Sequence, residues 1–206
     1  MSQQGSSLPQ EQQIYADLLD ETRTRIDFVT NCIKRCDEWP PIVLQEFCYL
    51  QYRMLCEYIA IMCMIAHGDI KTGAAMKEWR PPDIIERLQT LDPNFYPKGI
   101  RIVVHPETKV AHLENYNVPQ LTKEELVKLW ERSGDVLHLG NLKRVLRKHG
   151  KDIQVNVTEL MGICQKIINL LDNHVIFSAV NKTTQVAMMS SAQFGGKVGI
   201  WFAAGP

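Results

Sequence analysis

The 206-residue sequence has no excess of either charge, because 23 Lys and Arg residues balance 23 Asp and Glu residues. A chain with zero net charge has no overall field that draws it to nucleic acid or to a membrane, so such binding would need a local patch. Long apolar runs are also missing. The uncharged stretch after Glu57, residues 58–66, is far shorter than the ~20 residues that a membrane span needs.

Several catalytic and metal-binding motifs are absent as well. The sequence contains no paired CxxC, no HExxH and no Gly-x-Ser-x-Gly, which removes the usual signatures of zinc sites and serine hydrolases. Gly195 and Gly196 lack the strand, loop and helix context of a phosphate-binding loop. We therefore expect no cofactor and no metal.

The six cysteines do not form the framework of a small secreted protein, because five of them lie inside helical patterns. Cys32 and Cys36 are one helical turn apart and would need outside ligands to hold a metal, and no second cluster supports that reading. Residues 1–10 are polar and lack the apolar stretch of a secretory signal. We expect a disordered tail there and a cytoplasmic protein.

Hydrophobic periodicity predicts a mainly α protein, a helical bundle over residues 11–173. A small β-hairpin near residues 100–114 is expected on the outside of the bundle, and short strands in residues 174–206 are expected to form a C-terminal appendage packed on it. The predicted helices cover residues 11–37, 42–67, 81–91, 122–149 with a break, and 156–173.

Residues 43–66 form the most apolar predicted helix, which is typical of the buried middle of a bundle. Leu55, Ile59 and Met62 should be almost inaccessible there. The same helix places Arg53, Glu57 and His67 within an arc of roughly 80°. This stripe faces either solvent or the bundle, and in the second case Arg53 and Glu57 must be paired, because an unpaired buried charge is costly.

The segment from Trp130 to Gly140 contains the pair that is most informative about function, Arg132 and His138. On an unbroken helix six residues rotate the chain by about 600°, which leaves the two side chains roughly 120° apart. A helix break at Ser133 and Gly134, with a new helix starting at Asp135, would bring both to one concave site. Arginine binds phosphate and histidine transfers protons, as metal-free RNA cleavage requires.

Two further groups extend this candidate site. Glu57 is a natural partner to orient Arg132 or His138, with Arg53 in support, because a carboxylate beside an imidazole raises its pKa and fixes its tautomer. A dense basic patch follows in the sequence and is either an RNA-backbone contact or a solvated helix face. Its substrate-binding candidates are Lys143, Arg144, Arg147 and Lys148.

A mostly helical bundle with an arginine followed after a few residues by a histidine resembles the HEPN superfamily, with the motif on Arg132 and His138. The resemblance implies a metal-independent endoribonuclease of the toxin or antiviral-defence type. It also implies a homodimer in which two motifs line one cleft, and a possible antitoxin partner.

The alternative is a non-catalytic helical interaction or regulatory domain that binds a protein partner or RNA. The two functions differ in one observable feature. A nuclease places Arg132 and His138 in one open cleft, whereas an interaction domain leaves them in different environments.

Overall fold

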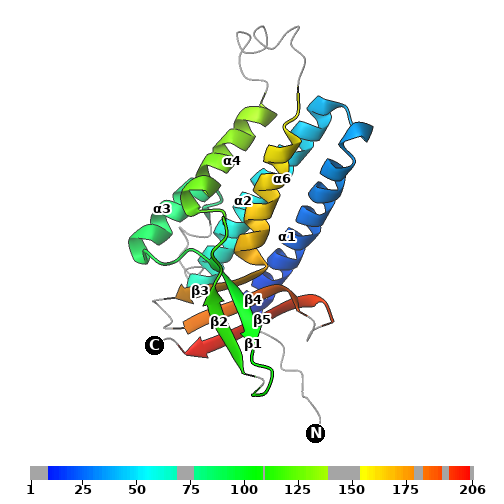
Figure 1. Ribbon diagram of the computed structural model, residues 1–206. Coiled ribbons are helices and arrows are strands. Elements are labelled where there is room, and N and C mark those ends of the chain that lie inside the picture. Colours follow the sequence, from blue (N-terminus) through cyan, green and yellow to red (C-terminus); the bar gives the residue numbers. More distant parts are fainter. Residues whose placement is uncertain are drawn as a thin grey trace.

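In the computed structural model, helices lie side by side above a sheet that closes one end of the bundle (Figure 1). The structure describes residues 9–68, 77–108, 110–138, 154–178, 183–191 and 195–204. Its helical elements are α1 (Gln10–Lys34), η1 (Cys36–Glu38), α2 (Pro41–His67), α3 (Pro81–Leu91), α4 (Lys123–Leu137) and α6 (Val157–Leu171). The strands are β1 (Lys98–Val104), β2 (Ala111–Asn115), β3 (Asn173–Ser178), β4 (Thr183–Ser191) and β5 (Lys197–Ala204).

Helix α2 is the centre of the core, as its composition predicts. Pro41 begins the helix, where a missing N–H is harmless, and Gly68 ends it in the left-handed conformation with φ 68°. Leu55, Ile59 and Met62 are 0%, 1% and 1% exposed. The prediction that these three side chains are almost inaccessible is therefore confirmed.

The helix break at Ser133 and Gly134 was predicted wrongly, because α4 runs without interruption from Lys123 to Leu137. The Ser133 hydroxyl donates to the Leu129 carbonyl at 2.7 Å, so it does not compete with the helix. The His138 N–H donates to the Gly134 carbonyl at 3.0 Å and closes the last turn. The predicted continuation to residue 149 lies outside the described residues.

The sheet is larger than the small hairpin and separate strands that the sequence suggested. Five strands form one sheet in the order β2-β1-β3-β4-β5, and every pairing in it is antiparallel. The hairpin is part of this sheet rather than a separate element on the bundle, because Lys98 and Gly99 of β1 pair with Val175 and His174 of β3. The mainly helical character is confirmed, but the sheet joins residues on both sides of the expected boundary at 173.

Helices and sheet are joined by a buried hydrogen-bonded chain. The Tyr15 hydroxyl of α1 lies 2.6 Å from Nε2 of His174 in β3, and Nδ1 of His174 lies 2.9 Å from the Leu171 carbonyl oxygen. A carbonyl only accepts, so Nδ1 carries the proton and Nε2 accepts from Tyr15. Burial lowers the pKa of His174 to about 4, which keeps the ring neutral.

No helix among the described residues is long and apolar enough to cross a membrane.

Candidate functional site

A groove of about 360 Å³ lies between α4 and α6 and includes Arg132 in its wall. Both helices contribute residues at the same spacing, which places each set on one helix face. The α4 set is Glu125, Lys128, Leu129 and Arg132, and the α6 set is Glu159, Gly162, Ile163 and Lys166. Leu121, from the loop before α4, completes the lining.

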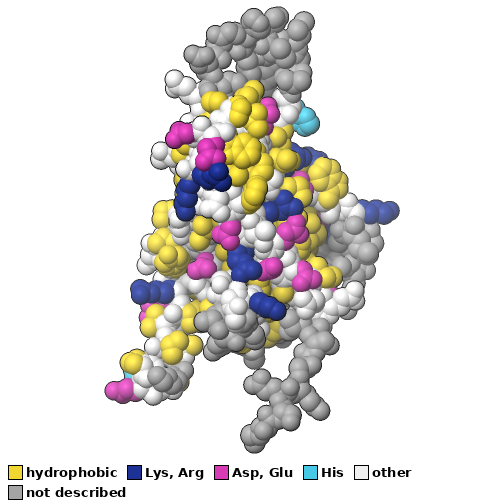
Figure 2. Space-filling model, turned by 90° about the vertical axis from the view of Figure 1, so that its right-hand side faces the viewer, with side chains coloured by type: hydrophobic (Ala, Val, Ile, Leu, Met, Phe, Trp, Pro, Cys, Tyr) yellow, Lys and Arg dark blue, Asp and Glu magenta, His cyan; other side chains and the backbone are white. Residues whose placement is uncertain are grey.

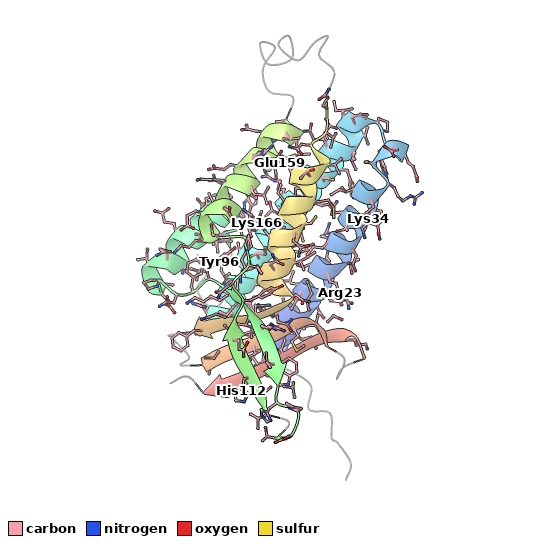
Figure 3. All side chains as sticks on the ribbon, in the orientation of Figure 1. Arg23, Lys34, Tyr96, His112, Glu159 and Lys166 are labelled. Atoms are coloured by element: carbon pink, nitrogen blue, oxygen red, sulfur yellow. The ribbon has the colours of Figure 1, made fainter. Side chains whose placement is uncertain are left out.

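Two ion pairs cross this groove from helix to helix. The Lys166 ammonium contacts the Glu125 carboxylate at 2.6 Å, and the Arg132 guanidinium donates to the Glu159 carboxylate. Figure 3 shows Glu159 and Lys166 on the same side of α6, about two turns apart. The apolar side chains of Leu129 and Ile163 lie between the pairs along the two helices. The groove therefore has an apolar middle with charges of both signs at its ends.

Helix capping fixes the two glutamates of the groove. The Thr122 side chain accepts from the Glu125 N–H and the Glu125 side chain accepts from the Thr122 N–H, which forms a capping box at the start of α4. Asn156 caps α6 by accepting from the Glu159 N–H at 3.0 Å. The hydrogen bond from Lys166, followed by that from the Thr122 backbone, lowers the pKa of Glu125. The carboxylate stays ionised at neutral pH.

Arg132 is held on one side and open on the other. Its guanidinium carbon lies 5.2 Å from the centre of the buried Tyr49 ring, and its hydrogen bond with Glu159 is the main cause that raises the pKa of Arg132. The side chain is nevertheless 51% exposed. A bound anionic group would therefore compete with Glu159 for an accessible guanidinium.

Arg53 and Glu57 belong to a different cluster, between α2 and α4. The Trp130 indole N–H donates to the Glu57 carboxylate at 2.9 Å, and Arg53 lies 3.5 Å from the same oxygen. The Arg53 guanidinium carbon is 4.2 Å from the centre of the Trp130 ring. The stripe faces the bundle, and its charges are paired as that orientation requires. The expectation that Glu57 orients Arg132 or His138 is not met by these contacts, since Glu57 binds Trp130 and Arg53.

Helix geometry separates this cluster from Arg132. Trp130 and Arg132 are two residues apart on α4 and therefore point about 200° apart around its axis. Trp130 faces α2, whereas Arg132 faces α6. Gly134 lies on the α2 side, where a Cβ would come within 2.9 Å of Arg53 Nη1.

His138 is the residue after the last turn of α4, and its side chain is exposed. It does not line the α4/α6 groove, whose described wall contains no histidine. Lys143, Arg144, Arg147 and Lys148 lie outside the described residues.

His67, the third ionisable residue of the stripe, lies deep in the protein. Its Nε2 is 3.6 Å from the Asp92 carboxylate, and its ring meets the Phe95 ring edge-on at 6.2 Å. The side chains of both His67 and Asp92 are almost fully buried. This pair joins the end of α2 to the end of α3.

The cysteines are free thiols, and five of them are buried. Across the described ranges, no group of three or more His, Cys, Asp or Glu side chains is placed to hold a metal ion.

A partly exposed aromatic cluster of Phe28, Trp39 and Phe47 marks a second surface where α1 and α2 meet η1. Phe47 stacks on Trp39 at 6.1 Å and meets Phe28 edge-on at 5.6 Å. Phe28, Val43 and Leu50 are exposed there, and Figure 2 shows apolar side chains gathered over the upper part of the α1 side of the molecule. A groove next to this cluster is lined by Cys32, Arg35 and other residues of the turn.

Sequence reasoning found Arg132 but missed the residues that surround it. Glu159, Gly162, Ile163 and Lys166 of the groove were not singled out. The signal was present as two helical stripes at steps of three, four and seven, each with an apolar residue between charged ones. The sequence does not say that these two stripes face each other.

Comparisons of the chain with protein-family models, with curated proteins and with solved structures found no match.

Proposed function

We propose that this protein is a non-catalytic helical binding module whose α4/α6 groove receives an acidic segment of a partner protein. One observation carries the proposal. Arg132 lines a groove with an apolar middle, Glu57 binds Trp130 and Arg53 instead, and the described lining of the groove includes no histidine. The described part of that groove offers binding contacts and no proton-transferring imidazole.

The charges of the groove favour an acidic occupant. Its lining contains the cations Lys128, Arg132 and Lys166 against the anions Glu125 and Glu159. A carboxylate of the partner would take Glu159's place on the accessible Arg132 guanidinium, and arginine binds carboxylates with two parallel hydrogen bonds. Apolar side chains of the partner would cover Leu129 and Ile163.

Gly162 provides a direct test of this groove. A Cβ built there meets nothing within 4 Å, so a methyl group fits at this position and a larger side chain starts out towards the open groove. A library of displayed peptides would be selected on wild-type protein, and the enriched peptides would be measured on Gly162→Trp and Gly162→Ala. We expect acidic amphipathic peptides that lose at least about tenfold in affinity with Trp, because the ring fills the groove, and bind normally with Ala.

Charge reversal supplies the second arm of this experiment. Arg132→Glu should weaken the same peptides by a similar factor, whereas Lys34→Glu, an exposed cation near the end of α1 (Figure 3), should not. Equal binding by wild type, Gly162→Trp and Arg132→Glu would show that the groove is not the binding site.

RNA cleavage by Arg132 and His138 is the second candidate function. It is favoured by one feature, the exposure of both side chains near the same end of α4. In this mechanism a ribose 2′-hydroxyl attacks the adjacent phosphate, His138 transfers the proton and Arg132 stabilises the charge that develops on the phosphate. The resemblance to HEPN proteins and the basic residues from Lys143 to Lys148 support the same proposal.

The test of cleavage is purified protein on mixed RNA in the presence of EDTA, with the product ends examined for 2′,3′-cyclic phosphate. His138→Ala should reduce cleavage by ~10²–10⁴-fold, and Arg132→Ala by a comparable factor. Lys34→Ala serves as the charge-matched control and should cut normally. Inert wild-type protein, or equal cleavage by all variants, would eliminate the nuclease.

A further inference from the structure

Strand β2 is an open edge of the sheet on a projecting arm. It occupies one end of the strand order, and all five of its residues are exposed. Figure 1 shows the β1–β2 hairpin extending below the rest of the sheet, and Figure 3 places His112 on this arm. A regular edge strand with unpaired backbone groups is a template for another strand.

The arm has one apolar face and one polar face. Residues directly opposite each other in an antiparallel pair share a face. Ile102 and Val104 of β1 lie opposite Leu113 and Ala111 of β2 and form the apolar face. Val104 and Leu113 are 55% and 50% exposed, so nothing within the described chain covers this end of the face.

The polar face carries charges of both signs. Arg101 lies opposite Glu114, and Val103 lies opposite His112. On β2 itself, His112 and Glu114 flank Leu113. The strand therefore presents a histidine on one side of Leu113 and a glutamate on the other.

The hydrogen bonds within the hairpin show which backbone groups of β2 point towards its free edge. The His105 N–H donates to the Val110 carbonyl at 2.9 Å, and such bonded pairs alternate along an antiparallel ladder. His112 and Glu114 therefore bond towards β1. The N–H and C=O groups of Ala111, Leu113 and Asn115 point outward.

We propose that β2 pairs with β2 of a second copy of this chain, antiparallel and in one register, with a two-fold axis at Leu113. In this register Leu113 meets Leu113 of the partner subunit, and Ala111 meets the partner's Asn115. These are the outward-pointing residues, so the pairing forms about six main-chain hydrogen bonds. The two sheets become one continuous sheet.

Side-chain chemistry selects this partner and this register. His112 meets the partner's Glu114 in a pair without main-chain hydrogen bonds, where side chains come closest. The symmetry gives this complementary pair twice. The apolar faces of the two arms also become continuous across the axis.

The start of β1, at the base of the hairpin, is held in place by contacts within the chain. A Cβ at Gly99 would come within 2.1 Å of the Asn169 carbonyl oxygen of α6, so only glycine permits this approach. The Gln120 side chain accepts from the Gly99 N–H at 2.9 Å and donates to the Gly99 carbonyl at 3.2 Å. A preorganised arm loses less entropy on pairing.

The opposite edge is less suited to self-pairing. Strand β5 is packed against α1, and its ladder with β4 has a register irregularity between Met188 and Ser191. Irregular pairing of this kind blunts an edge. Phe202 of β5 is 45% exposed and supplies a matched control for Leu113.

Sedimentation of the full-length protein from about 1 to 500 µM tests the pairing, since short strand pairings bury little area and associate weakly. We expect a concentration-dependent shift from 23.6 kDa to twice that mass. Leu113→Lys and His112→Glu should weaken dimerisation by about tenfold or more, because both place like charges against each other across the axis. His112→Lys and Phe202→Lys should dimerise as wild type does.

Cysteine cross-linking tests the register. In a Cys36→Ser background, which removes the most accessible native thiol, Leu113→Cys should form a covalent dimer under mild oxidation, because only the residue on the axis meets itself. His112→Cys and Phe202→Cys should not.

A monomer at every concentration would overturn the proposal. So would a dimer that Leu113→Lys and His112→Glu leave unchanged, or one that His112→Cys cross-links as well as Leu113→Cys. Thermal melts of each variant separate lost pairing from lost folding. The pairing uses neither Arg132 nor Gly162, so its outcome is independent of the proposed function.

Discussion

Two glycines inside helices have very different neighbours, so the same substitution should affect stability differently at each. Gly134 of α4 and Gly162 of α6 both carry the entropic cost of glycine within a helix. Gly134 lies against Arg53, which is held over Trp130 and beside Glu57. Gly162 faces open space in the groove. The same residue type therefore allows close packing at one site and leaves room at the other.

Alanine substitution should separate the two glycines. Gly162→Ala should stabilise the protein by roughly 0.5–1 kcal/mol, because it removes the cost of glycine and meets no atom. Gly134→Ala should give no gain or a loss, because the new methyl group displaces Arg53 from Trp130. Thermal melts and urea denaturation measure both differences.

A result in which both alanine variants gain equal stability would show that Arg53 moves aside without cost. The control is Arg53→Met, which removes the cation and leaves the residues of α4 unchanged. In the Arg53→Met background, Gly134→Ala should raise the free energy of unfolding by the full amount expected when a glycine within a helix is replaced by alanine.

At the scale of elements, the join between α1 and β3 depends on a neutral histidine. Burial lowers the pKa of His174 to about 4, with the hydrogen bond to Leu171 opposing that shift. The same burial raises the pKa of Tyr15 well above its ordinary value, so the phenol remains a donor. Protonation of His174 would place a charge in this buried join between the helix layer and the sheet.

The stability of the protein should therefore fall with acidification between about pH 6.5 and pH 4. The unfolded histidine takes up a proton near pH 6.5, whereas the folded one does so only near pH 4. The unfolded state binds more protons in this window, so stability is greatest above it and is lost as the pH falls through it. A shift of this size corresponds to about 3 kcal/mol.

Urea denaturation at several pH values measures this loss, and His174→Gln should flatten the profile between pH 6.5 and 4.5. Glu21 and Glu125 have lowered pKa values because of hydrogen bonds to their side chains. Their contributions are lost at lower pH, below about 4.5. An unchanged slope in His174→Gln would assign the pH dependence to other groups.

At the scale of the whole molecule, the helices and the sheet present different surfaces. The bundle carries the α4/α6 groove with its crossing ion pairs, and the sheet carries the hairpin arm at one edge. In Figure 2 the arm stands apart from the body of the molecule. An occupied groove and a paired arm are therefore compatible in one assembly.

The amino-acid sequence by itself determined most of the elements. Prolines at 40, 41, 81 and 82 and the Thr122 capping box set helix starts, and the apolar content of residues 43–66 set the buried helix. These signals are local, since a missing N–H, a cap or a hydrophobic stripe acts within a few residues. The strands of the hairpin and of the C-terminal part were predicted for the same reason.

Only the tertiary structure decided which faces meet. Ser133 and Gly134 indicated a break, yet α4 is continuous from Lys123 to Leu137, and the Ser133 hydroxyl bonds to the Leu129 carbonyl within the helix. Because α4 is continuous, Arg132 faces Glu159, and the Trp130 indole N–H donates to the Glu57 carboxylate. Pairings between residues far apart in the chain, such as Gly99 with His174, depend on which surfaces pack together, and no local pattern records that choice.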